Sequence, residues 1–176
     1  PKLGFVAGVA VATTLSKFVG PRAKLKWPND AVIDGAKLSG LLLEATQVHG
    51  HLACVIGIGI NCAHHPDDLP YAATHLAALG VTASATDVFV TLAQELALAL
   101  SRFDEGRGFA LIRQDWLAHA AGLGDTIKVS GREMREGLFK GLDDEGRLLL
   151  QTAQGLDVIE AGDVFLGQGA RNLQDH

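Results

Sequence analysis

The sequence is poor in cysteine and in positive charge. It has only two cysteines among 176 residues, Cys54 and Cys62, and they are not spaced as a CxxC pair. This excludes a disulfide-rich scaffold or a zinc framework, and it predicts reduced thiols in a cytoplasmic protein. The 15 lysines and arginines are outnumbered by 20 aspartates and glutamates, for a formal net charge of −5. No basic block dominates, which argues against general affinity for nucleic acid or acidic membranes.

The sequence also lacks internal repeats, low-complexity tracts and an apolar run long enough to cross a bilayer. Residues 3–12 imitate a signal peptide, because they follow Lys2 and end in Ala-Val-Ala. The run is shorter than the ~20 apolar residues that a membrane helix needs. We therefore favour the alternative, a buried core helix over residues 3–18, and expect no membrane partner. The chain begins at Pro1 without an initiator methionine, as a fragment or processed piece would.

What is present is typical of a soluble globular protein, with 48% apolar and 20% charged residues. The helical spacing of apolar residues predicts two further helices, at residues 86–103 and 109–121. The Gly-Leu-Gly segment that follows is the best domain boundary, so we expect domains at 1–121 and 122–176. Short strands separated by Gly and Asp turns then predict a small β-barrel. These strands are expected at 126–129, 138–141, 148–151, 157–159 and 164–166.

The chain is organised around a hairpin centred on Asp34 and Gly35. An Asp-Gly pair between apolar runs is a strong hairpin signal, because a type I′ turn needs positive φ at both central residues. Ile33 then pairs with Ala36, Val32 with Lys37 and Asp30 with Ser39. Asp30 and Lys37 therefore share a sheet face as diagonal neighbours, roughly 7–8 Å apart at the backbone. We expect room for a ligand group or a metal ion between their side chains.

Further strands flank this hairpin. Residues 23–27 alternate like a strand, and Pro28 should interrupt regular pairing because it cannot donate to a ladder. The second hairpin strand runs over 36–47, and residues 52–60 read as a strand buried on both faces. The His49-Gly50 turn between them admits more than one loop length, so this register stays open.

Other patterns are weak signals for chemistry. Gly57 and Gly59 resemble part of a dinucleotide fingerprint, but the third glycine is replaced by Cys62 and no helix start follows. The two glycines share one strand face, where they either admit a flat ligand or allow close packing of a helix. Residues 63–85 are irregular, and the histidines and aspartates at 64–68 have no recognised metal-ligand spacing, so we interpret them as a solvated loop.

Three motifs taken together match a known family. KWPND at residues 26–30, KLSGLLLE at 37–44 and GIGIN at 57–61 stand in the order and spacing of the biotin protein ligases. The resemblance extends over essentially the whole chain, and the first two motifs are specific as a pair. It implies an α+β fold: a mixed sheet with helices related to class II aminoacyl-tRNA synthetases, followed by an SH3-like barrel. Lipoate ligases share this fold and are the weaker match.

The resemblance also implies an activity and a set of site residues. Such enzymes use MgATP to convert biotin to biotinoyl-5′-adenylate and pass the acyl group to a lysine of a biotin carboxyl carrier protein. Lys37 would be the catalytic lysine that contacts the biotin carboxylate and the α-phosphate. Asp30 would be catalytic too, near the metal-bound phosphates or Lys37, and it is the candidate Mg²⁺ ligand. Asn29 would shape the nucleotide side.

The remaining implied contacts belong to the two ligands. Gly40 and Gly57 match positions that line the biotin slot, Leu42 would pack against the biotin body, and Asn61 would hydrogen-bond the adenine. The family also carries a GRGRxGR-type loop and a Ser/Thr-rich biotin-binding segment, and neither occurs in these 176 residues. We therefore expect this chain to form one wall of the site.

Two other functions compete with this interpretation. One is a non-catalytic module that binds biotin or a partner, motivated by the missing arginine loop. The other is a lipoate or octanoate ligase on the same scaffold. No helix-turn-helix domain precedes the core in this chain, so nothing in it supports a role in DNA binding. Sheet-mediated homodimers occur in the family, which makes a homodimer the candidate assembly.

Overall fold

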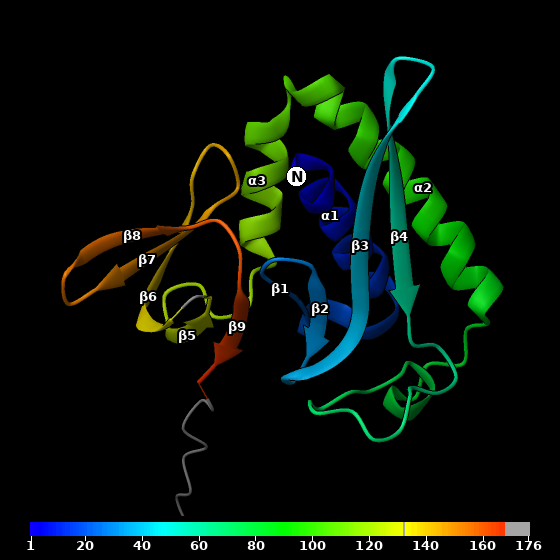
Figure 1. Ribbon diagram of the computed structural model, residues 1–176. Coiled ribbons are helices and arrows are strands. Elements are labelled where there is room, and N and C mark those ends of the chain that lie inside the picture. Colours follow the sequence, from blue (N-terminus) through cyan, green and yellow to red (C-terminus); the bar gives the residue numbers. More distant parts are fainter. Residues whose placement is uncertain (132, 168–176) are drawn as a thin grey trace, which may run out of the picture.

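The chain folds as helices and antiparallel sheets, an α+β arrangement (Figure 1). We describe it from a computed structural model that covers residues 1–131 and 133–167. The elements follow one another in a simple order: α1 (Lys2–Val19), β1 (Ala23–Lys26), β2 (Asp30–Ile33), β3 (Ala36–Val48), β4 (His51–Ile60), α2 (Ala85–Phe103), α3 (Phe109–Ala118), β5 (Thr126–Ser130), β6 (Met134–Leu142), β7 (Leu148–Thr152), β8 (Gly155–Ile159) and β9 (Asp163–Leu166).

Helix α1 lies at the centre of the first layer and confirms the predicted core helix. It contacts α2, α3 and the first sheet, and Figure 1 shows it enclosed between them. Its side chains are apolar on nearly every side, and Val6, Val11 and Leu15 are fully buried. The expectation that no apolar run is long enough to cross a membrane is wrong, because by length and composition the segment Lys2–Arg22 could do so, but 61% of its most apolar part is buried inside the fold. Its hydrophobicity therefore serves the core of the described structure.

The first sheet has the order β1-β2-β3-β4 and is antiparallel throughout. Strands β1 and β2 are separated at Trp27–Asn29, which confirms the break predicted at Pro28. The predicted turn between β2 and β3 is also confirmed, since Asp34 and Gly35 have φ values of 50° and 82°. Next to the turn, Ile33 pairs with Ala36 and Val32 with Lys37, as the sequence predicts.

Further from the turn the predicted register is wrong. Asp30 pairs with Gly40, and Ser39 pairs with Ala31, because the register shifts between Ala31 and Val32. Such a shift is a β-bulge: one extra residue on β3, at Leu38, has no partner on β2. The bulge reverses the alternation of faces, so that Lys37 and Gly40 lie on the same side of the sheet.

The β3–β4 hairpin is long and closes with a two-residue loop. His49 and Gly50 both have positive φ, and the pairing runs from Val48 with His51 to Ser39 with Ile60. This settles the register that the sequence left open. The prediction that β4 is buried on both faces is wrong, because Val55 is 58% exposed and alternate residues along the strand are exposed with it. Strand β4 is a sheet edge covered by helices on one face only.

Helices α2 and α3 cover α1. Ser84 caps α2 in a capping box with Asp87, which stabilises the first turn by satisfying free backbone N–H groups. A glycine-containing break separates the two helices, as predicted, and a Cβ on Gly108 would lie within 1.8 Å of the Arg102 carbonyl oxygen. Helix α3 ends at Ala118, three residues before the predicted end.

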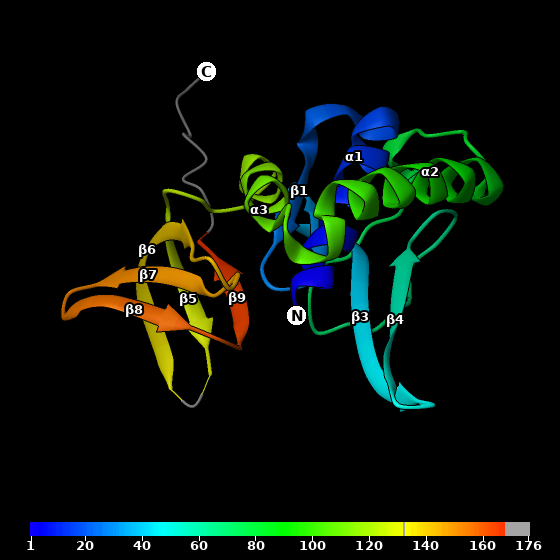
Figure 2. The same ribbon diagram turned by 90° about the horizontal axis from the view of Figure 1, so that it is seen from above.

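The second sheet contains the five remaining strands in the order β8-β7-β6-β5-β9. All of the predicted strands are present, and its core consists of buried apolar residues on one face: Ile127, Val129, Phe139, Leu148, Leu150 and Val164. The prediction of a closed barrel is not confirmed, because no pairing in the described part of the chain joins β8 to β9. Figure 2 shows this sheet beside the helical layer, with β5–β9 curled around their own core.

Candidate functional site

Three charged side chains meet at the first hairpin. Nζ of Lys37 lies 2.6 Å from Oδ1 of Asp30, and Nζ of Lys26 lies 3.4 Å from Oδ2 of the same carboxylate. We call these residues the lysine–aspartate cluster. Their side chains are partly buried, with exposures of 24% for Lys26, 14% for Asp30 and 29% for Lys37. The prediction that Asp30 and Lys37 share a face is confirmed, but the expected gap between them is absent because the two side chains are in contact.

The bulge and a glycine together create this contact. Because of the bulge, the main chain of Gly40 lies directly beneath the end of the Lys37 side chain. A Cβ on Gly40 would lie 3.2 Å from Cε and 3.3 Å from Nζ of Lys37, and 3.7 Å from Oδ1 of Asp30. The first two distances are tighter than ordinary contacts, so a larger residue here would push the ammonium group away from its carboxylate. Gly40 therefore allows the ion pair to form.

Glycines extend from the cluster along the same sheet face. Gly40 pairs with Gly59, and Leu42 pairs with Gly57, so all four residues point the same way. Gly57 and Gly59 are exposed, and Leu42 is 63% exposed. We call Gly40, Gly57 and Gly59 the glycine face. It leaves a strip of bare backbone beside the lysine–aspartate cluster, flanked by an apolar side chain, onto which a flat ligand can settle.

A loop that sequence reasoning dismissed returns to the cluster. Residues 61–76, the return loop, form main-chain bonds on both sides of Lys37: its N–H donates to the carbonyl of Ala72 at 2.8 Å, and its carbonyl accepts from the N–H of Thr74 at 2.9 Å. The ring of Tyr71 then lies 5.2 Å from Nζ of Lys37, within cation–π range. No sequence pattern pointed to this residue, the one tyrosine of the chain, which follows Pro70.

The return loop and the sheet enclose a small hollow of about 110 Å³. Cavities that hold small ligands are usually about 300–1,000 Å³, so this hollow accommodates one part of a ligand. Polar and apolar residues line it together: Lys37, Ser39, Gly40, Asn61, Pro66, Leu69, Tyr71 and Ala73. Lys37 of the cluster and Gly40 of the glycine face both belong to this lining, so the hollow and the glycine face meet at the ammonium group.

The two candidate asparagines have different surroundings. Asn61 lines the hollow, and its side-chain amide donates to the carbonyl of Thr74 at 3.0 Å, which ties the start of the return loop to its end. The side-chain amide of Asn29 instead donates to the carbonyl of Leu41 at 2.9 Å, and the N–H of Leu41 donates back to the carbonyl of Asn29. Asn29 therefore fixes the strand that carries Asp30, and it does not line the hollow.

The residues present do not fit a resident metal ion. Both oxygens of Asp30 face lysine ammonium groups, which already balance its charge. Within residues 1–131 and 133–167, no three His, Cys, Asp or Glu side chains converge as metal ligands. A protein-held Mg²⁺ site would need oxygen ligands at this point, and ammonium groups repel a divalent cation.

The arrangement instead favours an anionic ligand. Two ammonium groups and one carboxylate leave one net positive charge beside bare backbone, in a partly buried setting where electrostatic interactions are stronger than in water. A carboxylate or phosphate seated on Lys37 would have its flat or apolar portion over the glycine face. Positioning and charge neutralisation are the chemistry that this geometry supports.

Comparison with known families supports this interpretation. The family described as "Biotin/lipoate A/B protein ligase family" matches residues 3–61, and the one described as "Biotin protein ligase C terminal domain" matches residues 126–167. The first match contains the lysine–aspartate cluster and the glycine face. The second spans strands β5 to β9.

Similar whole proteins are also known. A biotin–[acetyl-CoA-carboxylase] ligase of Paracoccus denitrificans is 40% identical over 94% of this chain and 73% of its own length. A bifunctional ligase/repressor of Bacillus subtilis is 31% identical, and this chain spans 53% of it. Among solved structures, a biotin protein ligase from Aquifex aeolicus in complex with biotin and ATP superimposes with a TM-score of 0.78 and 26% identity, over 93% of this chain and 70% of that one.

Proposed function

This chain belongs to the biotin protein ligase family, and from that premise we propose that the Lys37 site activates biotin with ATP and transfers it to protein. The enzyme is a ligase. The acceptor is a lysine of a biotin carboxyl carrier protein, the class of substrate on which the family acts. The observation that carries the proposal is the lysine–aspartate cluster beside the glycine face, within the segment that the family match covers.

The reaction has two steps. In the first, an oxygen of the biotin carboxylate attacks the α-phosphorus of ATP, a new P–O bond forms, and the bond to pyrophosphate breaks. In the second, the amine of the carrier lysine attacks the acyl carbon of biotinoyl-adenylate, an amide forms and AMP leaves. Negative charge accumulates on the α-phosphate oxygens in the first step. A fixed ammonium at Lys37 stabilises that charge more in the transition state than in the ground state.

The other residues position the two substrates. Asp30 holds Lys37 in place through their 2.6 Å contact, so no reorganisation is needed when charge develops. Gly40 and Gly57 form the slot for biotin, and Leu42 packs against its apolar body. Asn61 hydrogen-bonds the adenine, a role supported by its place in the lining of the hollow next to Lys37. Asn29 shapes the nucleotide side indirectly, by fixing the strand that begins at Asp30.

Magnesium enters this proposal only as the counter-ion of ATP. The polar groups around Asp30 do not fit a resident ion, so we assign the triphosphate and water as its ligands. The role of Asp30 is then to hold the ammonium groups of Lys26 and Lys37 in place through its ion pairs. A carboxylate without lysine partners would be needed for a direct metal role.

Several broader expectations accompany the proposed function. The catalytic layer over residues 1–121 is expected to be related to class II aminoacyl-tRNA synthetases, and the domain predicted over 122–176 to be SH3-like. The curl of the five-stranded sheet supports the latter, although residues 132 and 168–176 of this domain lie outside the described part of the chain. A homodimer that forms through the sheet is the candidate assembly, supported by the open edge of β4. A cytoplasmic location is supported by the two free cysteines.

The test is biotin-dependent exchange of pyrophosphate into ATP, followed by transfer of biotin to a carrier domain. The full-length wild-type protein should catalyse both, and Lys37→Ala should lower the exchange rate by roughly 10²-fold or more. Lys24→Ala is the control. Lys24 lies on β1, as Lys26 does, but outside the cluster, so this variant should retain the wild-type rate. Biotin binding without exchange would instead support the non-catalytic module, and exchange driven by lipoate but not biotin would support a lipoate ligase.

A further inference from the structure

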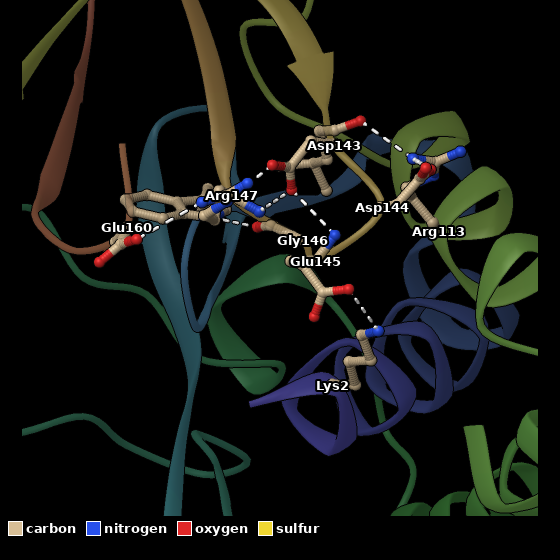
Figure 3. A network of polar contacts seen from close by, with 10 residues as sticks. Lys2, Arg113, Asp143, Asp144, Glu145, Gly146, Arg147 and Glu160 are labelled. Carbon is tan, nitrogen blue, oxygen red and sulfur yellow. Dashed lines mark hydrogen bonds and ion pairs between the residues drawn. The ribbon is translucent and has the colours of Figure 1, made fainter. Parts of the chain in front are cut away.

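One turn of the second sheet reaches into the catalytic layer. It joins β6 to β7 over residues 143–147, and we call it the docking turn. Figure 3 shows it between the sheet strands and helices α1 and α3, with polar contacts on each side. Gly146 is the buried residue of this turn, whereas Asp144 and Glu145 are exposed.

The docking turn is closed tightly by one of its own side chains. Oδ1 of Asp143 accepts the N–H groups of Glu145 at 2.9 Å and Arg147 at 2.8 Å, and Oδ2 accepts Nε of Arg147 at 2.7 Å. Burial alone would raise the pKa of the Asp143 carboxyl, but these hydrogen bonds and the Arg147 charge hold its pKa below the ordinary value. The carboxylate form therefore fixes the shape in which Gly146, at φ 82°, is presented to the core.

Gly146 contacts the catalytic layer at two points. Its carbonyl accepts the indole Nε1–H of Trp27 at 3.2 Å, in a buried hydrogen bond. Its α-carbon faces the ring of Phe5 so closely that a Cβ would lie 2.4 Å from Cε2. Around this contact, Lys2 pairs with Glu145 at 3.1 Å and Arg113 pairs with Asp144. Those ion pairs are partly exposed and contribute little to stability. The buried hydrogen bond to Trp27 therefore defines the position of the docking turn.

Trp27 links this contact to the site. It stands in the sequence directly after Lys26 and three residues before Asp30, the two residues whose side chains lie 3.4 Å apart in the cluster. Its indole is 3% exposed and is therefore held by packing as well as by the hydrogen bond. A shift of the indole would move the main chain on which both charged groups are mounted, and through Asp30 it would move Lys37.

We propose that the carbonyl of Gly146 positions the lysine–aspartate cluster through Trp27, so that the second sheet sets the rate of adenylate formation. Trp27 and Gly146 are positioning residues, because neither is placed against the substrates. The inference rests on the proposed function, since it concerns the rate of that reaction. It assigns the docking turn a role in the first chemical step, in which the carrier protein takes no part.

The test uses the intact enzyme and its two tryptophans. Trp27→Phe retains an aromatic ring and removes the Nε1–H donor. Trp116→Phe makes the same change at a buried position of α3, where the ring packs against Phe5 but, in the described part of the chain, has no hydrogen bond to the turn. Both should lower the thermal midpoint. Only Trp27→Phe should lower the single-turnover rate constant for adenylate formation, by roughly 10-fold or more, because small misplacements at a catalytic site are costly. With active enzyme in saturating excess, the single-turnover rate constant does not depend on the fraction of protein that is folded. It therefore reports the position of the catalytic groups.

A second variant keeps the proposal testable if the Trp27→Phe protein does not fold. Asp143→Ala opens the docking turn from its outer side and should reduce the same rate constant, while Asp157→Ala removes a carboxylate of β8 from the same sheet and should not. If Trp27→Phe or Asp143→Ala forms adenylate at the wild-type rate, the positioning role is overturned. If the wild-type enzyme itself forms no adenylate from biotin and ATP, the proposed function fails instead.

Discussion

Nζ of Lys37 lies 2.6 Å from Oδ1 of Asp30, and Nζ of Lys26 approaches the other oxygen of the same carboxylate at 3.4 Å. One carboxylate therefore holds two ammonium groups close together. Without it, the two lysines would repel one another in a partly buried site. The geometry makes Asp30 the residue on which the position of both cations depends.

Replacement of Asp30 by Asn should therefore disable the enzyme. Asp30→Asn removes the negative charge and releases Lys37, so we expect the rate of biotin-dependent pyrophosphate exchange to fall by roughly 10²-fold. The thermal midpoint should fall as well, because two neighbouring ammonium groups lose their counter-charge. Asp34→Asn is the matched control: its side chain is 71% exposed in the hairpin turn, and Asn tolerates the positive φ found there. Equal rates for both variants would contradict the role of Asp30.

Gly40→Ala should affect catalysis more than binding. The new methyl would lie 3.2 Å from Cε of Lys37, so the ammonium must move away from Asp30. We expect kcat for adenylate formation to fall about 10-fold. Gly57→Ala adds its methyl without a clash, at 3.4 Å from the Leu42 carbonyl oxygen, and should instead raise KM for biotin by narrowing the slot. Steady-state kinetics of the two variants distinguish these outcomes, and an unchanged kcat for Gly40→Ala would show that Lys37 can relocate without loss.

His119 should make the fold sensitive to mild acid. Burial lowers the pKa of His119, the nearby Lys24 ammonium lowers it further, and Asp115 opposes them. The unfolded chain therefore binds a proton more readily than the folded one. The resulting stability is fully present above the unfolded pKa of about 6.5 and is lost as the pH falls through the folded pKa.

The measurement is the thermal midpoint at several pH values between about 7 and 5. The midpoint of wild-type protein should fall more steeply with acidification than that of His119→Gln, which cannot take up the proton. His51→Gln, at an exposed position of β4, should retain the wild-type slope. If His119→Gln and wild type show the same slope, the imidazole does not contribute to acid sensitivity.

The two cysteines should react at different rates. Cys54 is exposed on β4, whereas Cys62 is half-buried, its Sγ donates to the Ile60 carbonyl at 3.6 Å, and burial raises the pKa of its thiol. The thiolate is the reactive form, so iodoacetamide at neutral pH should alkylate Cys54 first. Peptide mass spectrometry follows each site. In denaturant the two rates should converge, and faster alkylation of Cys62 in the folded protein would contradict the structure.

The sequence was sufficient where local chemistry decides the structure. The Asp34-Gly35 turn, the pairing of Val32 with Lys37 and the core helix over residues 3–18 all follow from turn propensity or apolar patterning, and the structure confirms them. The same local rules placed Asp30 and Lys37 on one face. Their actual contact depends on the bulge at Leu38, and no residue type there marks a bulge.

Long-range features could not be read in the same way. The return loop binds the main chain of Lys37 through backbone groups of Ala72 and Thr74, and backbone hydrogen bonds leave no trace in side-chain identity. The alternation of residues 23–27 placed Lys26 in a strand but did not indicate that its ammonium group approaches Asp30. The link from Trp27 to Gly146 spans 119 positions and depends on how two sheets meet, which neither periodicity nor spacing encodes.

Strand β4 ends the first sheet, and no strand in the described part of the chain pairs with its outer side. From His51 to Ile60 it carries no acidic residue, no lysine, no arginine and no proline, the residues that usually protect an exposed edge from joining another chain. Gly57 and Gly59 lie in this strand, and glycine has low β-propensity. The two glycines that leave the backbone of β4 bare thus also weaken the edge as a template for aggregation, and bulkier replacements at Gly57 or Gly59 risk insolubility.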